Sequence, residues 1–296
     1  MANKDINTVT NASAISSADY IFISKNGANL QKVKADTFSG QQYSNGLLFS
    51  NTANISTGAH NSIFRGKSLG TSFTSAQSSE ISSGRFTDMF IGDYWTINGH
   101  TWRIAAFDPF YRCGDNVDLG HHIAVVPDAC LYNAQMHNTE GGAYVAGSEA
   151  NTTTGGYVSS DMRTTNLAQA TTTVETDFGS SHVLSYRDML TNAVGTYAGT
   201  TNVAIGWAWT SCKVELMSET MVYGQKVWAN SPYEVGCCCF QLPLFRLAPN
   251  FIHIRAYWWL RSVASATSFA YVNSYGLASN ASASNPYGVR PLALIA

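Results

Sequence analysis

The segment at residues 257–291, YWWLRSVASATSFAYVNSYGLASNASASNPYGVRP, alternates two kinds of residue. Large or conformationally special residues recur along it: Trp258, Trp259, Leu260, Arg261, Phe269, Val272, Gly276 and the sequence Gly-Val-Arg-Pro at 288–291. Between them stand almost only Ala, Ser, Thr, Asn and Tyr. Burial of the large apolar side chains contributes about 1.5–3 kcal/mol each, and the two arginines can hold carbonyls or carboxylates with their planar donor groups. The pattern predicts a fixed backbone whose exposed side chains can be exchanged at small cost.

The exchangeable residues have the composition of a binding surface. Tyr combines contact area with a hydroxyl at low entropic cost, and Ser and Asn add adaptable hydrogen bonding. Around FAYVNSYG, residues 271, 273 and 275 share the two-residue period of a strand, and Gly276 permits a turn. We expect a clustered and mostly exposed binding face composed of Thr267, Ser268, Tyr271, Asn273, Ser274, Tyr275, Ser279, Asn280, Ser282 and Tyr287. The scaffold expected beneath it is Trp258, Trp259, Leu260, Arg261, Gly288 and Arg290.

Composition excludes several classes of partner. Of 296 residues 45% are hydrophobic and 12% charged, with a net charge of −2, so the basic surface that nucleic acids require is not expected. No apolar run approaches the roughly 18 residues of a membrane span. The N-terminus MANKDINTVTNAS lacks the apolar core of a signal peptide. We therefore expect synthesis in the bacterial cytoplasm without Sec-dependent export. A protein released by cell lysis would lack a signal peptide in the same way.

The first 85 residues differ from the rest in composition and in the pattern of apolar residues. Within 1–45, two strand-like runs at 20–24 and 29–33 flank Asn26-Gly27, a pair that suits a tight hairpin turn. A two-stranded hairpin is marginal alone, so this region is expected to lean on other chains or on a neighbouring protein. Residues 46–85 are rich in Ser, Thr and Gly and predict a stalk or linker.

Residues 86–296 predict one globular α+β domain. DYWTINGHTWRIAAFDPF reads as two strands around an Asn98-Gly99 turn, and HHIAVVPDA as a strand ended by Pro127. KVELMSETMVYG offers another strand, and the C-terminal segment offers several short ones. DMRTTNLAQATTTVETDF has helical spacing, with Ser160 or Asp161 as cap, and SYRDMLTNAV predicts a second short helix. The expected core includes Trp95, Trp102, Leu260 and Val289.

No constellation for catalysis stands out, and the protein is not expected to be an enzyme or to need a metal or cofactor. The common hydrolase, nucleotide and zinc motifs are missing. The adjacent His121 and His122 would point to opposite faces of a strand. Glu215 and Glu219 could lie together on a helix, but capping or exposed carboxylates are far commoner, and no partner is assignable to Asp188 or His253.

The six cysteines do not predict a disulfide framework. Three stand apart, at Cys113, Cys130 and Cys212, and three are contiguous at 237–239. Contiguous side chains diverge, and no C-x-x-C pair exists, so a shared metal is not expected. Structural or incidental thiols are the preferred interpretation.

Taken together, the motifs GDYWTINGHTWRIAAFD, VVPDACLYNAQMHN, GGYVSSDMRTTNLAQA, VELMSETMVYG, QLPLFRLAPNFI and the W-L-R-S…G-V-R-P frame resemble a phage and prophage protein family. Its members carry a C-type-lectin-like domain related to the formylglycine-generating-enzyme fold. The resemblance covers about residues 85–296. More weakly, the N-terminal TVTNASAISSADYIFISKNGANLQKVKADTF resembles the start of phage tail fibres.

The resemblance implies a function. In many members the C-terminus is the variable region of a diversity-generating retroelement, in which mutagenic reverse transcription changes adenines, often in Asn codons, and yields residues such as those at 251–291 here. It implies a receptor-binding protein at a phage or prophage tail tip, whose partner is a host cell-surface protein or glycan. It further implies attachment to other tail proteins through the N-terminus, and a homotrimer.

Two alternatives remain open because fold does not carry function. One is an enzyme of the formylglycine-generating type, whose cysteine-based copper site cannot be mapped onto this sequence. The other is a carbohydrate-active domain, although the Glu-Pro-Asn and Trp-Asn-Asp signatures of calcium lectins are missing and SNPYG resembles them only in part.

Overall fold

The computed structural model describes residues 20–23, 31–34, 57–137, 152–232 and 235–296. The chain divides into two compact units, Met1–Ile55 and Ser56–Ala296. In the first unit, β1 (Tyr20–Ile23) pairs antiparallel with β2 (Gln31–Lys34). The two expected strands are therefore confirmed, whereas the Asn26-Gly27 turn and the remainder of residues 1–56 lie outside the described part of the chain.

Residues 57–85 belong to the second unit, so the prediction that they form a stalk or linker is wrong. They contain α2 (Thr57–His60), β3 (Ser68–Gly70) and α3 (Ser75–Ser82). Thr74 and Gln77 form a reciprocal capping box at the start of α3, and Ile81 is fully buried. Sparse apolar residues suffice here because Ile81 joins a core formed mostly by later parts of the chain, which local composition does not reveal.

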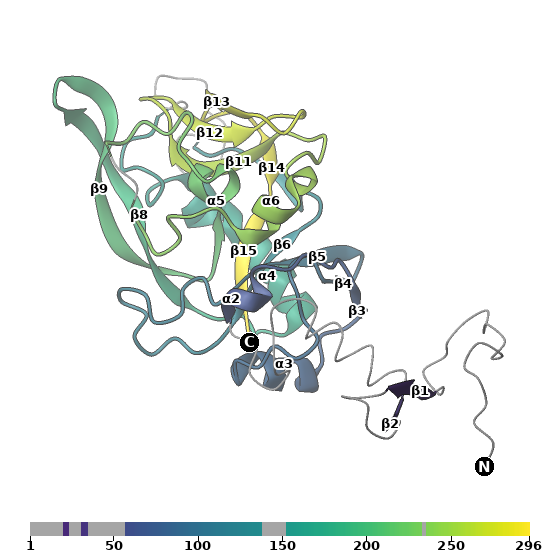
Figure 1. Cartoon of the computed structure of the whole chain (residues 1–296). Helices are drawn as coiled ribbons and strands as arrows, with labels where there is room; N and C mark the ends of the chain where they lie inside the picture. Colours follow the sequence, from purple (N-terminus) through teal and green to yellow (C-terminus); the bar gives the residue numbers. More distant parts are fainter. Residues whose placement is uncertain (1–19, 24–30, 35–56, 138–151, 233–234) are drawn as a thin grey trace, which may run out of the picture. The chain divides into compact units, whose positions relative to one another are not determined.

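A six-stranded sheet forms the larger layer of the second unit (Figure 1). Its order is β10-β15-β6-β5-β4-β3, in which only β3 and β4 run parallel. The strands not yet given are β4 (Tyr94–Ile97), β5 (His100–Phe107), β6 (Ile123–Pro127), β10 (Val214–Leu216) and β15 (Pro291–Ile295). Positive φ angles at Asn98 and Gly99 close the predicted β4–β5 hairpin.

The predicted variable region forms most of a second, five-stranded sheet. Its order is β13 (Ala278–Ser282), β12 (Ser268–Val272), β11 (Trp258–Val263), β14 (Tyr287–Val289) and β7 (Tyr132–Ala134). β11 pairs antiparallel with β12 and parallel with β14. Arg290 alone separates β14 from β15, so one short stretch of chain links the two sheets.

The helical predictions had mixed outcomes. The helix expected after residue 160 is confirmed as a π-helical turn, Met162–Asn166, that continues into α4 (Leu167–Phe178), and the Ser160 hydroxyl accepts a hydrogen bond from the Arg163 amide. The second predicted helix is wrong: that sequence forms β8 (Tyr186–Tyr197), paired with β9 (Thr200–Cys212) in a long hairpin that projects beyond both sheets (Figure 1). A partner strand rich in Thr and Trp outweighs the local helical spacing.

Three short helices complete the unit: α5 (Glu219–Tyr223), α6 (Pro243–Leu247) and a 3₁₀ turn at Pro249–Phe251. The architecture is α+β, with most of its regular structure in sheets, as predicted. Within the described residues, no helix has the length and apolar character needed to cross a membrane.

One disulfide corrects the interpretation of the cysteines. Cys113 and Cys237 are bonded across 124 residues of sequence, with Cα atoms 5.8 Å apart. A loop of this size restricts the unfolded chain enough to stabilise the folded state by about 5 kcal/mol on the chain-entropy model. Sequence spacing cannot reveal such a pair, because it depends on tertiary structure.

The expected core residues Trp95, Trp102, Leu260 and Val289 are all fully buried. Trp102 also donates a 2.7 Å hydrogen bond from its indole nitrogen to the Asp177 carboxylate. Replacing Trp102 by Ala should lower the free energy of unfolding by about 3–5 kcal/mol, because the change leaves a cavity and removes a donor from a buried carboxylate.

Urea unfolding followed by far-UV circular dichroism measures this loss. Trp228→Ala is the matched control, since Trp228 is 47% exposed and should cost less than half as much. Equal losses in the two variants would contradict the central position of Trp102 in the core.

Candidate functional site

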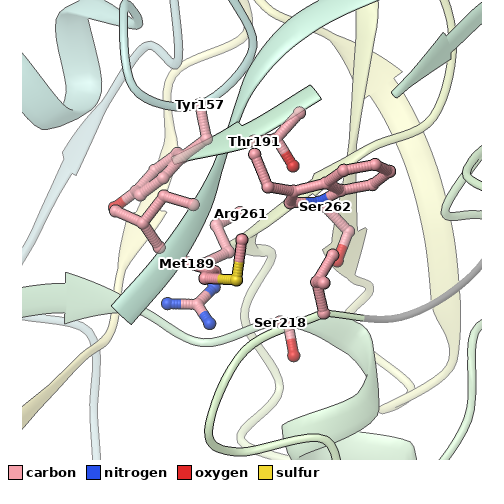
Figure 2. Close-up of a pocket in the computed structure, with 9 residues that line it drawn as sticks. Tyr157, Met189, Thr191, Ser218, Arg261 and Ser262 are labelled. Atoms are coloured by element: carbon pink, nitrogen blue, oxygen red, sulfur yellow. The ribbon is translucent and has the colours of Figure 1, made fainter. Parts of the chain in front are cut away.

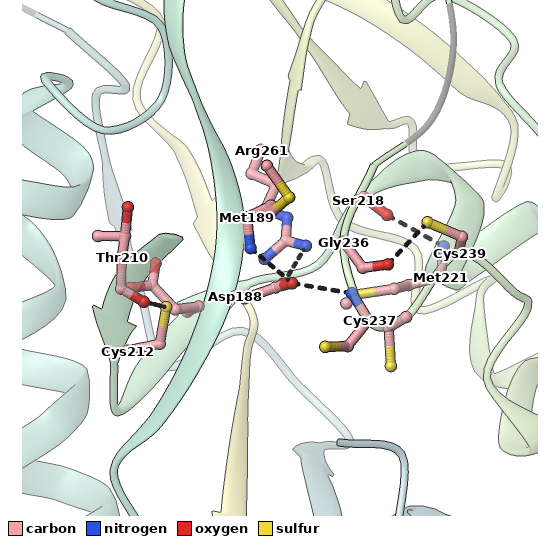
Figure 3. Close-up of polar contacts among 12 residues, drawn as sticks. Asp188, Met189, Thr210, Cys212, Ser218, Met221, Gly236, Cys237, Cys239 and Arg261 are labelled. Carbon is pink, nitrogen blue, oxygen red and sulfur yellow. Dashed lines mark hydrogen bonds and ion pairs between the residues drawn. The ribbon is translucent and has the colours of Figure 1, made fainter. Parts of the chain in front are cut away.

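A buried ion pair holds the central strand of the five-stranded sheet. Arg261 of β11 donates from Nη2 to the carboxylate of Asp188 on β8 at 2.7 Å. The other Asp188 oxygen accepts the amides of Met189 at 2.9 Å and Cys237 at 3.1 Å (Figure 3). Burial alone would lower the pKa of Arg261, but the Asp188 charge outweighs it and raises that pKa. Asp188, which had no assignable partner in the sequence, is thus the anchor of β11.

Arg290 fixes the junction between the two sheets. It is fully buried and donates to the carbonyls of Pro127 and Phe251, both at 2.8 Å. Its guanidinium also lies 4.9 Å from the Trp258 ring centroid. Burial lowers the pKa of Arg290 to about 10. The sequence predicted that both arginines would hold carbonyls or carboxylates. In the structure Arg261 binds a carboxylate and Arg290 binds two carbonyls.

Three tyrosines gather over Trp259 on one side of this sheet; we call Tyr257, Tyr271 and Tyr287 the tyrosine cluster. Ring centroids are 4.7 Å apart for Tyr271–Tyr287, 5.3 Å for Tyr257–Tyr287 and 5.9 Å for Tyr257–Tyr271. The buried Trp259 lies 5.0 Å from Tyr287 and is the register partner of Tyr271, which places both on one face. Packed aromatic rings of this kind form a rigid surface.

The hydroxyl groups of the cluster also lie near one another. Desolvation is the largest cause of the raised pKa of Tyr287, followed by the proximity of Tyr271 and a hydrogen bond with it, with Tyr257 contributing less. The Asn285 amide approaches the Tyr287 hydroxyl at 3.4 Å. The cluster therefore offers a neutral surface that combines ring faces with hydrogen-bonding groups.

Tyr257 was missing from the predicted binding face, although it is 47% exposed. It precedes Trp259 by two residues, a spacing that places both on one side of a strand. The sequence shows that alternation. It does not show that Tyr257 belongs to the cluster, because this depends on β14 bringing Tyr287 beside it.

The ten residues of the predicted binding face do not form one exposed surface. Two are exposed, Thr267 and Tyr275. Ser268 is buried, contrary to the prediction, and the others are half-buried: Tyr271, Asn273, Ser274, Ser279, Asn280, Ser282 and Tyr287. Register explains part of this. Tyr271 pairs with Ser279 on one side of the sheet, whereas Ser268 pairs with Ser282, and Ala270 with Asn280, on the other.

The expected strand alternation through residues 271, 273 and 275 also stops early. β12 ends at Val272, and the Asn273 side chain accepts the amides of Tyr275 at 2.9 Å and Leu277 at 3.0 Å, which forms a turn. Gly276 supports it with a φ of +78°, as predicted. Tyr275 is 78% exposed at this turn. The ring contacts that define the tyrosine cluster do not involve it.

The carboxylates considered for catalysis have structural partners. Glu215 lies in β10 and Glu219 begins α5, so they do not share a helix. Glu215 accepts hydrogen bonds from the Tyr157 hydroxyl at 2.8 Å and from Arg163 Nε at 3.0 Å, and burial raises the pKa of Glu215. Glu219 accepts the backbone amides of residues 227, 228 and 229. Both carboxylates thus position chain segments.

A small cavity adjoins the Arg261 side chain. It measures about 40 Å³ and is lined by Tyr157, Met189, Leu190, Thr191, Trp207, Ser218, Val235, Arg261 and Ser262 (Figure 2). That volume holds a water molecule or two, not a sugar or a peptide. In the described parts of the chain, no group of three or more His, Cys, Asp or Glu side chains is placed to bind a metal ion.

Comparison with known proteins gives one match. The family described as a domain of unknown function (DUF6273) matches residues 200–296, which include the tyrosine cluster, the Arg261 and Arg290 anchors and every strand of the five-stranded sheet except β7. No curated protein and no solved structure matches the chain.

Replacing Asp188 by Asn should lower the free energy of unfolding by about 3–5 kcal/mol, because the buried Arg261 charge loses its counter-charge. Asp115→Asn is the matched control: Asp115 pairs with Arg187 at 3.3 Å, but both side chains are more than 40% exposed, so the expected loss is below about 1 kcal/mol. Urea denaturation of both variants tests this, and a loss below 1 kcal/mol for Asp188→Asn would contradict the anchoring role.

Proposed function

We propose that this chain is a receptor-binding protein of a phage or prophage tail, and that the tyrosine cluster is the centre of its ligand-binding surface. One observation carries the proposal: partly exposed aromatic side chains converge on the sheet that bears the exchangeable residues, over a frame held by buried ion-pair and carbonyl contacts. Energetically dominant binding residues are typically Tyr, Trp and Arg in well-packed positions.

A C-type-lectin-like fold is part of the proposal. It is supported by the W-L-R-S…G-V-R-P frame, whose Trp258, Leu260 and Arg290 are buried. It is also supported by the path of the C-terminal strand, which inserts between β6 and β10 in the larger sheet. This path returns the chain to the body of the domain after the binding segment, so both ends of that segment are tied down.

The same frame accounts for tolerance of sequence change in the binding segment. Its anchors are Trp258, Trp259, Leu260, Arg261 and Arg290, all of which are buried. The Ser and Asn residues at 279, 280 and 282 lie in β13, an edge strand with one neighbour, β12. Substitutions at half-exposed positions of an edge strand usually change stability little, which suits a surface whose specificity is retuned.

The proposed ligand is a protein or glycan of the bacterial surface. The N-terminal unit is proposed to attach the chain to other tail proteins and to hold a homotrimer in the virion. The hairpin supports this part, since two strands are marginal without further packing.

Replacing any one residue of the tyrosine cluster by Ala should weaken adsorption of the purified protein to a susceptible bacterial strain by about thirtyfold or more, which corresponds to about 2 kcal/mol. The melting temperature should fall only slightly, because the rings are partly exposed. Tyr197→Ala, at a 49% exposed tyrosine of the β8–β9 hairpin, and Tyr275→Ala are matched controls. The Tyr197 variant should adsorb normally, and the Tyr275 variant should lose less than any cluster variant.

Normal adsorption by all three cluster variants would refute the proposed site. Unfolding of these variants would instead show that the tyrosines belong to the core, and the milder Tyr→Phe changes, which keep the ring and remove the hydroxyl, would then test the hydrogen-bonding role.

The full chain should have three times the monomer mass in multi-angle light scattering at micromolar concentration, and a fragment beginning at Ser56 should be monomeric. A monomeric full chain, or a fragment that trimerises equally well, would contradict trimerisation through the N-terminal unit.

A further inference from the structure

The Cys113–Cys237 disulfide tethers a segment that belongs to no helix or strand; we call residues 235–239 the cysteine loop. It lies in the connection between α5 and α6, within which the described residues include no helix or strand. Connections of this length without regular structure are uncommon and are often functional. Besides the disulfide, the Cys237 amide donates to Asp188, and the Asn116 side-chain amide lies 3.7 Å from the Cys237 sulfur. The Cys238 side chain is buried, with its sulfur 3.8 Å from the Pro109 carbonyl oxygen.

Reactive sulfur is concentrated at this loop. Both disulfide residues are half-buried and Cys239 is exposed. The other thiols are protected: burial raises the pKa of Cys130 to about 11, that of Cys212 to about 12 and that of Cys238 well above its usual value. Because the thiolate is the reactive form, a small reductant or oxidant acts on Cys113, Cys237 and Cys239 before it acts on the others.

The loop closes over the anchor of β11. The Cys237 amide donates to one Asp188 oxygen while Arg261 holds the other. Gly236 lies so close, with a φ of +121°, that a Cβ atom there would press against the same carboxylate. Without the loop, this carboxylate would lose a donor and gain contact with water. Both changes weaken its hold on Arg261, two residues from the Trp259 base of the tyrosine cluster.

We propose that Cys113 and Cys237 form a redox latch: oxidation locks the cysteine loop over the Asp188–Arg261 pair and orders the tyrosine cluster, and reduction releases both. In the closing reaction the Cys237 thiolate attacks a low-molecular-weight disulfide such as oxidised glutathione and releases one thiolate. The Cys113 thiolate then displaces the second, so two protein thiols become one disulfide as one small disulfide becomes two thiols. The consequence for binding rests on the proposed function.

Such a latch suits a protein that passes from a reducing to an oxidising compartment. Cytosolic glutathione and thioredoxin keep thiols reduced, whereas disulfides persist outside the cell. A chain released by lysis would therefore be completed as a binder only after release.

Alkylation of the native full chain, followed by mass spectrometry, tests the chemistry. With iodoacetamide before reduction, Cys239 should be modified and Cys113 and Cys237 should not. After mild reduction with dithiothreitol, both should be modified while Cys212 and Cys238 remain protected. Modification of Cys113 and Cys237 in air-oxidised protein before reduction would overturn the latch.

Hydrogen exchange tests the structural consequence in wild type with and without dithiothreitol, in the Cys113→Ser/Cys237→Ser double variant, and in Cys239→Ser. In the reduced wild type and the double variant, exchange at the Cys237 amide and across residues 257–272 should accelerate about tenfold or more, as in local opening. Cys239→Ser, which keeps the disulfide, should match the oxidised wild type. Acceleration confined to residues 235–239 would overturn the link to the tyrosine cluster. If the double variant unfolds, hydrogen exchange in the reduced wild-type protein alone tests the latch.

Adsorption of oxidised and reduced wild type to a susceptible bacterial strain gives the binding result. Weaker adsorption of the reduced form, restored on reoxidation, is expected. Equal adsorption of the two forms despite faster exchange at 257–272 would overturn control of binding by the latch. If neither form adsorbs and the cluster variants behave identically, the proposed function fails, while the exchange data still decide the latch.

Discussion

The Asp188 carboxylate brings together three segments that are distant in sequence: strand β8 that carries it, strand β11 through Arg261, and the 235–239 loop through the Cys237 amide. Breaking such a pair leaves an uncompensated buried charge, so the three segments have to be arranged together. β11 is the central strand of the five-stranded sheet, with β12 on one side and β14 on the other. The position of every ring in the tyrosine cluster therefore depends on this one carboxylate.

The two arginines hold the two ends of the segment at residues 257–291, which we propose carries the binding surface. Arg261 ties its first strand to β8, and Arg290 ties its end to the carbonyls of Pro127, the last residue of β6, and of Phe251 in the 3₁₀ turn. Just before Arg261 in β11, Trp258 and Trp259 point to opposite sides of the strand and are both fully buried. Only one of them contributes to the surface, because Trp259 lies beneath the tyrosines while Trp258 lies against the Arg290 guanidinium.

Local chemistry made part of this structure predictable. Asn98-Gly99 defines its hairpin through backbone preference alone, and the Trp95 and Trp102 positions follow from alternation about that turn. The buried frame around Leu260 and Val289 was also predictable, since apolar residues among polar fillers have few other uses. The α+β class followed from the presence of both strand-like alternation and helical spacing of apolar residues in the sequence.

What could not be predicted depends on strand pairing across long stretches of sequence. The helical spacing of 185–194 does not reveal that β9 will pair with it, nor does the sequence around Cys113 reveal Cys237 beside it. The tyrosine cluster is of the same kind. Tyr257, Tyr271 and Tyr287 come from a strand flank and two separate strands, and only the parallel pairing of β11 with β14 brings the third to the others.

The register between β12 and β13 also determines which residues of the proposed binding surface can contact one ligand. Ser279 lies opposite Tyr271, so a change there alters the surface beside the cluster, whereas Asn280 and Ser282 lie on the other side of the sheet with Ala270 and Ser268. A single small ligand on the tyrosine side of the sheet can therefore contact only one of the three Ser and Asn residues in β13, Ser279. A ligand that contacts both sides of the sheet has to reach around the β13 edge and the turn at 273–276, where Tyr275 is exposed. The geometry favours a partner large enough to contact the edge of the sheet as well as its face, which a protein surface provides more readily than a single sugar.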